Sequence, residues 1–450
     1  MTSNLRKDLK SMNDRHKNSR LLFAFSLAVC CLTLNAQEIT ANKTVDENGK
    51  VNISFNLVAK NESVTASVFS VKFVGSVDGK KSFSLKSLNG DGATGIVIGS
   101  GKKTAVWDPS GNKIKPEDVD KVNINVETDD VTEEATYLVL NLKTYQMSYQ
   151  KEEPSLKGGK NKTKEIWFRR IEPGSFLMGS TATELGREED ETQHNVSISQ
   201  AFYLSIFETT QKQFQTIARY NPSNYKGSTR PVDSVSYNML RGDEEGSTWP
   251  QKTDHSVDKS YYDHEKTKVC DAFFYLLREK TGNSLIFDLP TEAQWEYACR
   301  AGESTSLNDG NNLTNIFVDA NLNQLAWYDS FHYLWLENIK KWNAEEKKNR
   351  PRPVGSKSPN KWGLYDMHGN VEEYCLDYYK IDLGYYRTTD PVGAYKNDAF
   401  IDEHKRGPYR VSRGGSCFTD AKYCRSAARN CNLPDYSVSG HGFRIALLPK

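Results

Sequence analysis

The cysteines of this chain are the residues whose type and spacing could carry chemistry. Six of them lie beyond residue 36: Cys270, Cys299, Cys375, Cys417, Cys424 and Cys431. Their even number suits disulfide pairing in an oxidising compartment, and none forms the C-x2-C spacing typical of zinc sites. Three of the six fall in the last forty residues, close to a Gly414-Gly415 pair. That segment is therefore either a catalytic site or a framework that the rest of the chain must hold in place.

The N-terminus indicates the compartment. Residues 1–20 carry six basic side chains, and an apolar run follows from Leu21 to Leu34. A basic start, a short apolar core and a small residue, here Ala36, are typical of a secretory signal peptide, so we expect residues 1–36 to be removed. No apolar run, here or later, is long enough to span a bilayer comfortably. We therefore predict a secreted or periplasmic protein of the cell envelope, with no transmembrane segment after the signal peptide.

The charge balance excludes one class of partner. The full chain has 59 basic and 58 acidic side chains. Loss of residues 1–36 would remove six basic and two acidic ones, so the remaining chain would be slightly acidic. Such a chain does not attract nucleic acid or an anionic membrane surface. Its length of 450 residues predicts two or three domains.

The first domain is predicted at residues 37–147. Apolar and polar residues alternate strictly from Val51 to Leu57, and a second β-rich run turns at Asp78-Gly79, a favoured hairpin pair. Further short β-rich runs follow at 96–98, 104–107, 122–126 and 137–142. This series predicts an all-β, immunoglobulin-like sandwich. It contains no cluster of His, Cys or carboxylate residues, so we expect a spacer or docking module.

A polar, Gly- and Lys-rich stretch at 148–165 is the predicted linker, and the second domain is predicted at 166–450. Its sharpest local signal is a helix after Thr291, where Gln294 three residues later completes a capping box. Another predicted helix ends before Gly282. Elsewhere regular elements are few and connections are long, which predicts a loop-rich α+β domain. Interactions other than the hydrogen bonds between strands must hold those loops in place.

Six segments of the second domain stand in a fixed order. They are FRRIEPGSFLMGS (168–180), IFETTQKQF (206–214), PVDSVSYNML (231–240), FDLPTEAQWEYACRAG (287–302), WGLYDMHGNVEEYCLDYY (362–379) and RVSRGGS…CRSAAR…GFRIAL (410–447). In this order they resemble the formylglycine-generating enzyme family, also called sulfatase-modifying factors. The resemblance implies an α+β fold related to C-type lectin domains. A β-sandwich ahead of such a domain resembles an arrangement seen in secreted Bacteroidetes proteins.

The resemblance implies that calcium holds the loops. The positions matching one family calcium site are Asp366, Gly369, Val371 and Glu373, two carboxylates and two backbone carbonyls, which are oxygen ligands that Ca²⁺ prefers. A plain Gly-Asn turn with solvated acids is the alternative. A second family site begins at positions matching Asn321 and Leu322.

The resemblance also implies a possible copper site. Active members hold Cu(I) with two cysteines and convert a sulfatase cysteine to formylglycine; soft thiolates suit Cu(I). Ser416 matches the serine after the family's Gly-Gly pair, and Cys417 and Cys424 are the candidate catalytic cysteines. Here the loop is about three residues shorter than in active members, and Glu372 stands where the family usually has Trp. The shortened loop favours a structural role, with disulfides among Cys417, Cys424, Cys375 and Cys431, over a displaced copper pair.

Three functions remain open from the sequence. The first is a diverged, calcium-braced binding or scaffold module with an unidentified protein or peptide partner. The second is an active copper-dependent oxidase that generates formylglycine. The third is a structural component of a cell-envelope secretion or gliding assembly. The chain has no P-loop, no G-x-G-x-x-G and no G-x-S-x-G motif, which excludes the chemistry tied to them.

Overall fold

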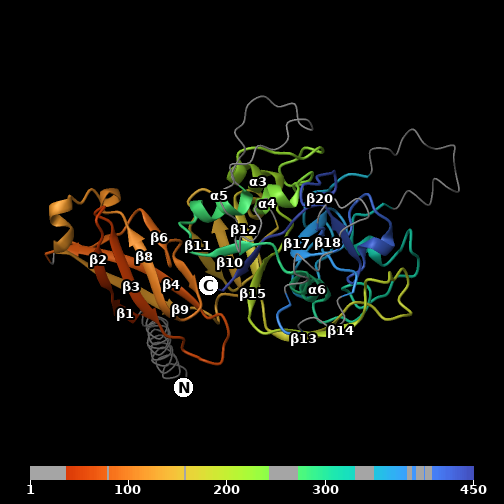
Figure 1. The fold of residues 1–450 in the computed structure, drawn as a ribbon, viewed down its shortest axis with the longest axis horizontal. Helices are drawn as coiled ribbons and strands as arrows, with labels where there is room; N and C mark the ends of the chain where they lie inside the picture. The colour runs from red at the N-terminus through yellow and green to blue at the C-terminus, as the bar shows by residue number, and fades with distance from the viewer. Residues whose placement is uncertain are drawn as a thin grey trace, which may run out of the picture.

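The computed structural model describes residues 37–78, 81–156, 159–242, 272–329, 349–382, 388–391, 400 and 408–449. The predicted signal peptide, Gly79 of the predicted hairpin turn, and Cys270 lie outside these residues. A strand-rich N-terminal part and a loop-rich part with short helices and strands follow one another along the longest axis (Figure 1). The predicted class, an all-β sandwich followed by an α+β domain, is confirmed.

Two sheets form the N-terminal sandwich. One has the strand order β1-β9-β4-β5, with β7 also pairing with β4, and the other has the order β2-β3-β8-β6. The elements are β1 (Gln37–Thr40), β2 (Asn42–Val45), β3 (Val51–Leu57), β4 (Val68–Val77), β5 (Phe83–Ser84), β6 (Leu88–Gly90), β7 (Ile96–Ile98), β8 (Gly101–Trp107), β9 (Val122–Asp130) and the 3-10 turns η1 (Pro109–Asn112) and η2 (Pro116–Lys121). Every second side chain of β3 is buried, as the alternation predicts. Phe55, Phe73 and Trp107 join one core cluster that draws on both sheets.

The boundary between the two parts differs from the sequence prediction. The strands β10 (Tyr137–Asn141) and β11 (Met147–Gln150) were expected at the end of the sandwich and in the linker. Instead, β10 pairs with β12 (Glu165–Ile171), and both strands belong to a six-stranded sheet of order β11-β10-β12-β15-β21-β16. The burial of β10 explains this: its first four side chains are all buried, so it does not alternate like a half-exposed sandwich strand.

The second part contains short elements joined by long loops. Its strands are β13 (Gly174–Met178), β14 (His194–Ile198), β15 (Phe202–Ser205), β16 (Ile286–Asp288), β17 (Glu372–Tyr378), β18 (Arg410–Arg413), β19 (Arg429–Asn432), β20 (His441–Gly442) and β21 (Ala446–Leu448). Its helices are α2 (Lys160–Thr163), α3 (Gln211–Ala218), α4 (Tyr237–Arg241), α5 (Phe273–Lys280), α6 (Glu292–Arg300), α7 (Leu322–Leu325) and the 3-10 turn η5 (Ala421–Cys424). A four-stranded sheet of order β19-β18-β17-β20 carries parts of the last two family-like segments, 362–379 and 410–447.

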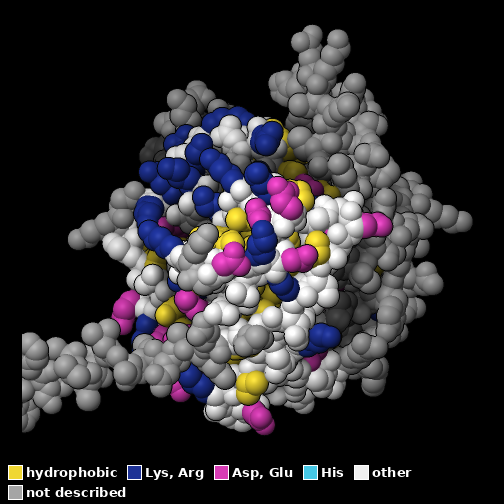
Figure 2. Space-filling model, turned by 90° about the vertical axis from the view of Figure 1, so that its left-hand side faces the viewer, with side chains coloured by type: hydrophobic (Ala, Val, Ile, Leu, Met, Phe, Trp, Pro, Cys, Tyr) yellow, Lys and Arg dark blue, Asp and Glu magenta, His cyan; other side chains and the backbone are white. Residues whose placement is uncertain are grey.

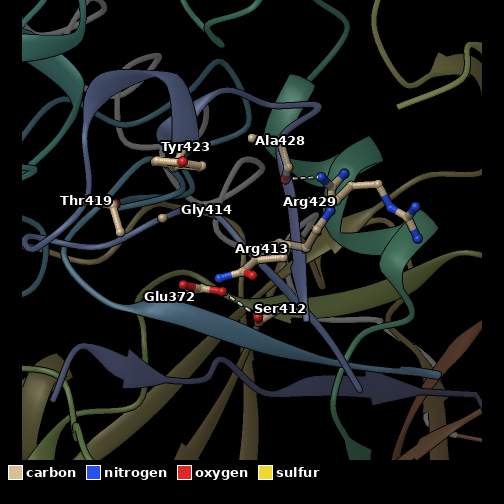
Figure 3. A pocket seen from close by; sticks show the side chains of 10 residues that line it. Glu372, Ser412, Arg413, Gly414, Thr419, Tyr423, Ala428 and Arg429 are labelled. Carbon is tan, nitrogen blue, oxygen red and sulfur yellow. Dashed lines mark hydrogen bonds between the residues drawn. The ribbon is translucent and has the colours of Figure 1, made fainter. Parts of the chain in front are cut away.

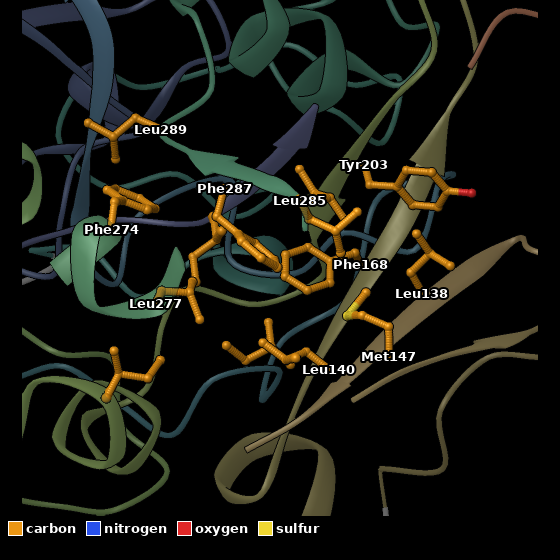
Figure 4. Close-up of a cluster of buried hydrophobic side chains, with 14 of the residues drawn as sticks. Leu138, Leu140, Met147, Phe168, Tyr203, Phe274, Leu277, Leu285, Phe287 and Leu289 are labelled. Carbon is orange, nitrogen blue, oxygen red and sulfur yellow. The ribbon is translucent and has the colours of Figure 1, made fainter. Parts of the chain in front are cut away.

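The main core cluster crosses the boundary between the two parts. Leu138, Phe168, Leu277 and Phe287 pack together, from the six-stranded sheet and from α5 (Figure 4). Val68 of the sandwich belongs to the same cluster. Burying one such side chain fully contributes roughly 1.5–3 kcal/mol. The sandwich is therefore packed against the second part and is not joined to it by a linker alone.

Polar contacts reinforce this junction. The guanidinium of Arg170 donates to the carbonyls of Ala66 and Thr65, at 2.9 and 2.7 Å. A second contact joins the two parts, since the Gly90 N–H donates to the Gly282 carbonyl at 2.6 Å. Buried main-chain N–H and carbonyl groups need hydrogen-bonding partners, and at this junction each of the two parts supplies partners to the other.

The sandwich end of the molecule has a charged surface. Lys and Arg side chains gather over the upper left of this face, with acidic side chains among and below them and small scattered apolar spots (Figure 2). Within the part of the chain that the structure describes, no helix has the length and apolar character needed to cross a membrane.

The predicted capping box of α6 is confirmed and gives a test of local stability. The Thr291 hydroxyl accepts from the Gln294 N–H at 3.1 Å, and the Gln294 side chain accepts from the Thr291 N–H at 3.0 Å. We expect Thr291→Ala to lower the free energy of unfolding by about 1 kcal/mol, measured by urea denaturation. Thr183→Ala, at an exposed position outside any helix, is the control and should change little. Equal effects of the two substitutions would contradict a capping role.

Candidate functional site

The loop from Asp366 to Val371 needs unusual backbone conformations. Asp366, Gly369 and Asn370 have positive φ angles of 56°, 77° and 64°. A Cβ atom at Gly369 would lie 2.3 Å from the carbonyl oxygen of Trp327, so only glycine fits there. The Asn370 N–H donates to that same carbonyl at 2.7 Å. The loop is therefore held against the segment that contains Trp327.

Two buried carboxylates meet at this loop. Asp366 accepts from the Gly355 N–H at 2.6 Å. Glu208, in the loop before α3, accepts from the Val371 N–H at 2.9 Å and from the Asn370 side-chain amide at 2.6 Å. Burial raises the pKa of Asp366 to about 6, and burial together with nearby carboxylates raises that of Glu208 well above its ordinary value. Glu208 was not predicted as a site residue from the sequence, although it stands in the family-like segment 206–214.

The structure gives Glu373 a different set of partners. Its two carboxylate oxygens each accept from Arg444, at 2.6 Å, and one also accepts from the Trp295 indole N–H at 2.7 Å. Both Glu373 and Arg444 are buried. This carboxylate is thus held in a bidentate ion pair. The ion pair leaves fewer of its oxygen lone pairs free to bind a metal than the sequence prediction assumed.

The oxygen atoms at this loop are of the type that a hard cation binds. Carboxylate and carbonyl oxygens are the ligands of Ca²⁺, and burial raises the pKa values of Glu208 and Asp366 although the positive charge of Arg444 acts on both of them. Among the described residues, no group of three or more His, Cys, Asp or Glu side chains could by itself hold a metal ion. A calcium ion would therefore depend on these two carboxylates together with backbone carbonyls, such as those of Gly369 and Val371.

The second predicted calcium position lies at the start of α7. The N–H groups of Asn321 and Leu322 donate to Asp319, at 2.9 and 3.0 Å. The Leu322 carbonyl accepts from the Ala326 N–H inside the helix. These contacts cap the helix. Further ligands are expected in the segment after Trp327, of which residues 330–348 lie outside the described residues.

The three candidate catalytic residues lie in and around the loop between β18 and η5. Ser416 and Cys417 are nearly fully buried, and the Cys417 N–H donates to the Asn370 carbonyl at 3.0 Å. Cys424 packs in an apolar cluster with residues that include Leu322 and Tyr328. Its sulfur lies close behind Gly415, since a Cβ atom added there would be 2.7 Å from Sγ. The cysteine loop and the predicted calcium loop therefore touch.

The thiols of this loop are held in their neutral form. Burial raises the pKa of Cys424 to about 12, and burial raises that of Cys417 well above its ordinary value, with Glu208 and Asp233 adding to the effect. All five cysteines that the structure describes are free. The predicted disulfides are thus not seen among Cys375, Cys417, Cys424 and Cys431. Neutral, buried thiols are poor nucleophiles, because the thiolate is the reactive form.

Buried arginines surround the cysteine loop. Arg425 contacts Glu191 at 2.6 Å and Glu184 at 2.7 Å. Arg429 makes a two-point contact with Glu292, at 2.6 and 3.0 Å. In addition, Arg413 pairs with Glu296. These residues from the CRSAAR and RVSRGGS segments are structural, and they tie the C-terminal strands to α6 and to the loop before β14.

A cavity of about 260 Å³ opens beside the cysteine loop. It is lined by Glu372, Ser412, Arg413, Gly414, Gly415, Thr419, Tyr423, Ala428, Arg429 and Asn430. Glu372 and Ser412 lie together on strands β17 and β18, and Tyr423 lies across the cavity from them (Figure 3). The Ser412 hydroxyl donates to Glu372, and Asn432 donates to the same hydroxyl at 2.9 Å. From the sequence, Glu372 was predicted only to differ from the Trp that the family usually has at this position.

These features define a protein of the formylglycine-generating enzyme type. The family model described as the sulfatase-modifying factor enzyme 1-like domain matches residues 156–448. The chain belongs to this family, as the motif order predicted.

Three curated relatives show the range of similarity. The chaperone protein LppX of Paenibacillus barcinonensis is 31% identical over 199 residues, which cover 41% of this chain and 65% of that protein. The formylglycine-generating enzyme of Thermomonospora curvata is 35% identical over 167 residues, 36% of this chain and 49% of that protein. The Bos taurus enzyme is 28% identical over 306 residues, 61% of this chain and 73% of that protein. The chain thus spans less than two thirds of the first two relatives.

Two solved structures are similar over about three fifths of this chain. Treponema denticola variable protein 1 has a TM-score of 0.42 at 26% identity, covering 63% of this chain and 95% of that one. PvdO from Pseudomonas aeruginosa has a TM-score of 0.43 at 22% identity, covering 62% of this chain and 94% of that one.

Asp377 on β17 predicts a pH dependence of stability. It accepts from the Glu292 N–H at 2.7 Å, and burial, with Glu292 adding to it, raises its pKa from 3.8 to about 7. Because the pKa of Asp377 is higher in the folded state than in the unfolded state, protonation of its carboxyl group stabilises the fold. This stabilisation is complete below about pH 4 and is lost as the pH rises through about 7.

We expect Asp377→Asn, which keeps the acceptor for the Glu292 N–H, to remove this slope. The variant should gain stability relative to the parent on going from about pH 4 to about pH 8, by up to about 4 kcal/mol. Urea unfolding across this range measures the difference. Parallel stability curves for the two proteins would show that Asp377 has an ordinary pKa.

Proposed function

We propose that this protein is a diverged member of the family that works as a calcium-braced binding or scaffold module and not as an oxidase. The cysteine loop carries this proposal. Cys417 and Cys424 are seven positions apart, both are buried, and their thiol pKa values are raised. A Cu(I) site needs two deprotonated sulfurs that face one another and can be reached by oxygen and substrate.

The framework around the loop supports a binding role. The arginine pairs of Arg413, Arg425 and Arg429 keep the C-terminal strands rigid, so the surface they present is preorganised for a partner. The relative from Paenibacillus barcinonensis is named a chaperone, which is a protein-binding function. Together with the predicted signal peptide, this favours a protein or peptide partner in the cell envelope, where a secretion or gliding assembly is one setting.

A direct assay separates this proposal from the oxidase. We expect no formylglycine when the protein is incubated with Cu(I), oxygen and a Cys-x-Pro-x-Arg peptide, with product followed by mass spectrometry. The Thermomonospora curvata enzyme, assayed alongside, is the positive control. Formation of formylglycine that is lost in Cys424→Ser would overturn the scaffold proposal and establish the alternative, a copper-dependent oxidase with a variant site.

Calcium should stabilise the fold through Asp366 and Glu208. Removal of calcium with a chelator should lower the melting temperature by several degrees, because a ligand at a hundred times its Kd contributes about 2.7 kcal/mol. Asp366→Asn and Glu208→Gln should abolish the response, whereas Asp309→Asn, an exposed acid elsewhere, should keep it. A melting curve of the parent protein that does not respond to chelator would refute the calcium brace.

A further inference from the structure

A small cavity lies where α2 and β12 meet the start of α3. Polar side chains of Asn161, Ser205, Thr209 and Gln213 line it, together with apolar ones. Its volume is about 10 Å³. A cavity of roughly 10–15 Å³ is the smallest that holds a water molecule, and it does so where two to four polar groups are within reach. The cavity therefore has the size and the type of wall that suit a single water.

Two buried oxygen atoms at this cavity have no hydrogen-bonding partner among the described residues. They are Oδ1 of Asn161 and Oγ1 of Thr209. Asn161 is 4% exposed and Thr209 is 2% exposed, so bulk water does not reach either side chain. A buried polar atom without a partner is costly, and nearly all such atoms in folded proteins bond to the protein or to ordered water. Each of these oxygens therefore calls for a partner within the cavity.

The other polar side chains of the cavity already bond to main-chain groups. The Ser205 hydroxyl donates to a carbonyl at 2.8 Å and accepts from an N–H at 3.0 Å. The Gln213 amide donates to a carbonyl at 2.7 Å and accepts from an N–H at 2.8 Å. Nδ2 of Asn161 donates to the Ser155 carbonyl at 3.0 Å, which distinguishes it from the oxygen of the same amide. These bonds leave the two oxygens to a small molecule that can both donate and accept.

Direct contacts set the separation of the elements around the cavity. The Thr210 hydroxyl donates to the Lys162 carbonyl at 2.6 Å, from the start of α3 to α2. The Gln213 amide reaches the Glu165 carbonyl, at the start of β12. The ammonium of Lys162 donates to the Val354 carbonyl at 2.7 Å. Because these bonds hold α2 in place, a bridging molecule can serve two oxygens that do not bond to one another.

We propose that this cavity binds one ordered water molecule, which donates to Oδ1 of Asn161 and exchanges a second hydrogen bond with the Thr209 hydroxyl. The water joins α2 to the loop before α3. Residues 148–165 were predicted as a linker, and this bridge makes the α2 part of that segment a fixed element of the second part. The inference goes beyond the proposed function and does not depend on it.

A high-resolution crystal structure tests the proposal directly. We expect one solvent peak within roughly 3.2 Å of both oxygen atoms in the parent protein. Thr209→Val keeps the shape of the side chain and removes its hydroxyl, so the peak should be lost. Thr216→Val is the matched control, because the Thr216 hydroxyl donates to the Lys212 carbonyl on α3 and does not line the cavity. The peak should remain in this variant.

Three crystallographic results would overturn the bridge. The first is a cavity without a solvent peak in the parent protein. The second is a direct hydrogen bond between the side chains of Asn161 and Thr209. The third is a peak that stays in place in Thr209→Val, which would show that the hydroxyl does not hold it.

Thermal unfolding gives an independent test whose sign distinguishes the two cases. If a water bonds to the Thr209 hydroxyl, Thr209→Val removes that bond and should lower the melting temperature by a few degrees. If the hydroxyl has no partner, the same substitution removes an unsatisfied buried group and should raise the melting temperature or leave it unchanged. Either of the latter results would contradict the bridge. Thr216→Val should shift the melting temperature less than Thr209→Val does.

A double-mutant cycle tests whether one water serves both oxygens. Asn161→Ala and Thr209→Val each remove one partner, and the remaining partner holds the water less well. The combined loss in free energy of unfolding, measured by urea denaturation, should therefore be smaller than the sum of the two single losses. Additive losses would show that the two side chains act separately, and the bridge would be excluded.

Discussion

Pairing of buried arginines with buried carboxylates is the interaction on which the second domain depends. Arg444 with Glu373, Arg425 with Glu191, Arg429 with Glu292 and Arg413 with Glu296 each join segments far apart in the sequence. Removing one partner of such a pair would leave an uncompensated buried charge, which typically costs 3–5 kcal/mol. These ion pairs therefore fix the arrangement of the loops in a domain that has few hydrogen bonds between strands.

This framework connects segments that carry the family motifs. The arginines and their acids connect β18 and β19 to α6, and β17 to the segment that carries Arg444. In this chain the loop between Gly415 and Cys424 turns its thiols inward, Cys424 into an apolar cluster and Cys417 beneath the predicted calcium loop. Glu372 places a charge where an indole is usual, and the cavity lies beside it.

Much of the fold was predictable from local signals. The alternation of Val51–Leu57 and the capping box of Thr291 and Gln294 depend on neighbours in the sequence, and the structure shows both. The ordered motifs predicted the family, since glycines such as Gly369 and Gly414 stand where the backbone has a positive φ and a close neighbour. The candidate site was predictable to the same extent: its loops were found, but not the partners of its side chains.

The sequence by itself determined the elements, the family and the loops that carry the site, because spacing and residue type act over a few residues. Only the tertiary structure decided that β10 and β11 join the second sheet, that Glu208 meets Asp366, and that Glu373 is taken by Arg444. It also decided that Cys417 and Cys424 are buried and that Glu372 faces a cavity. Each of these depends on groups brought together from distant parts of the chain, whose burial sets charge and reactivity.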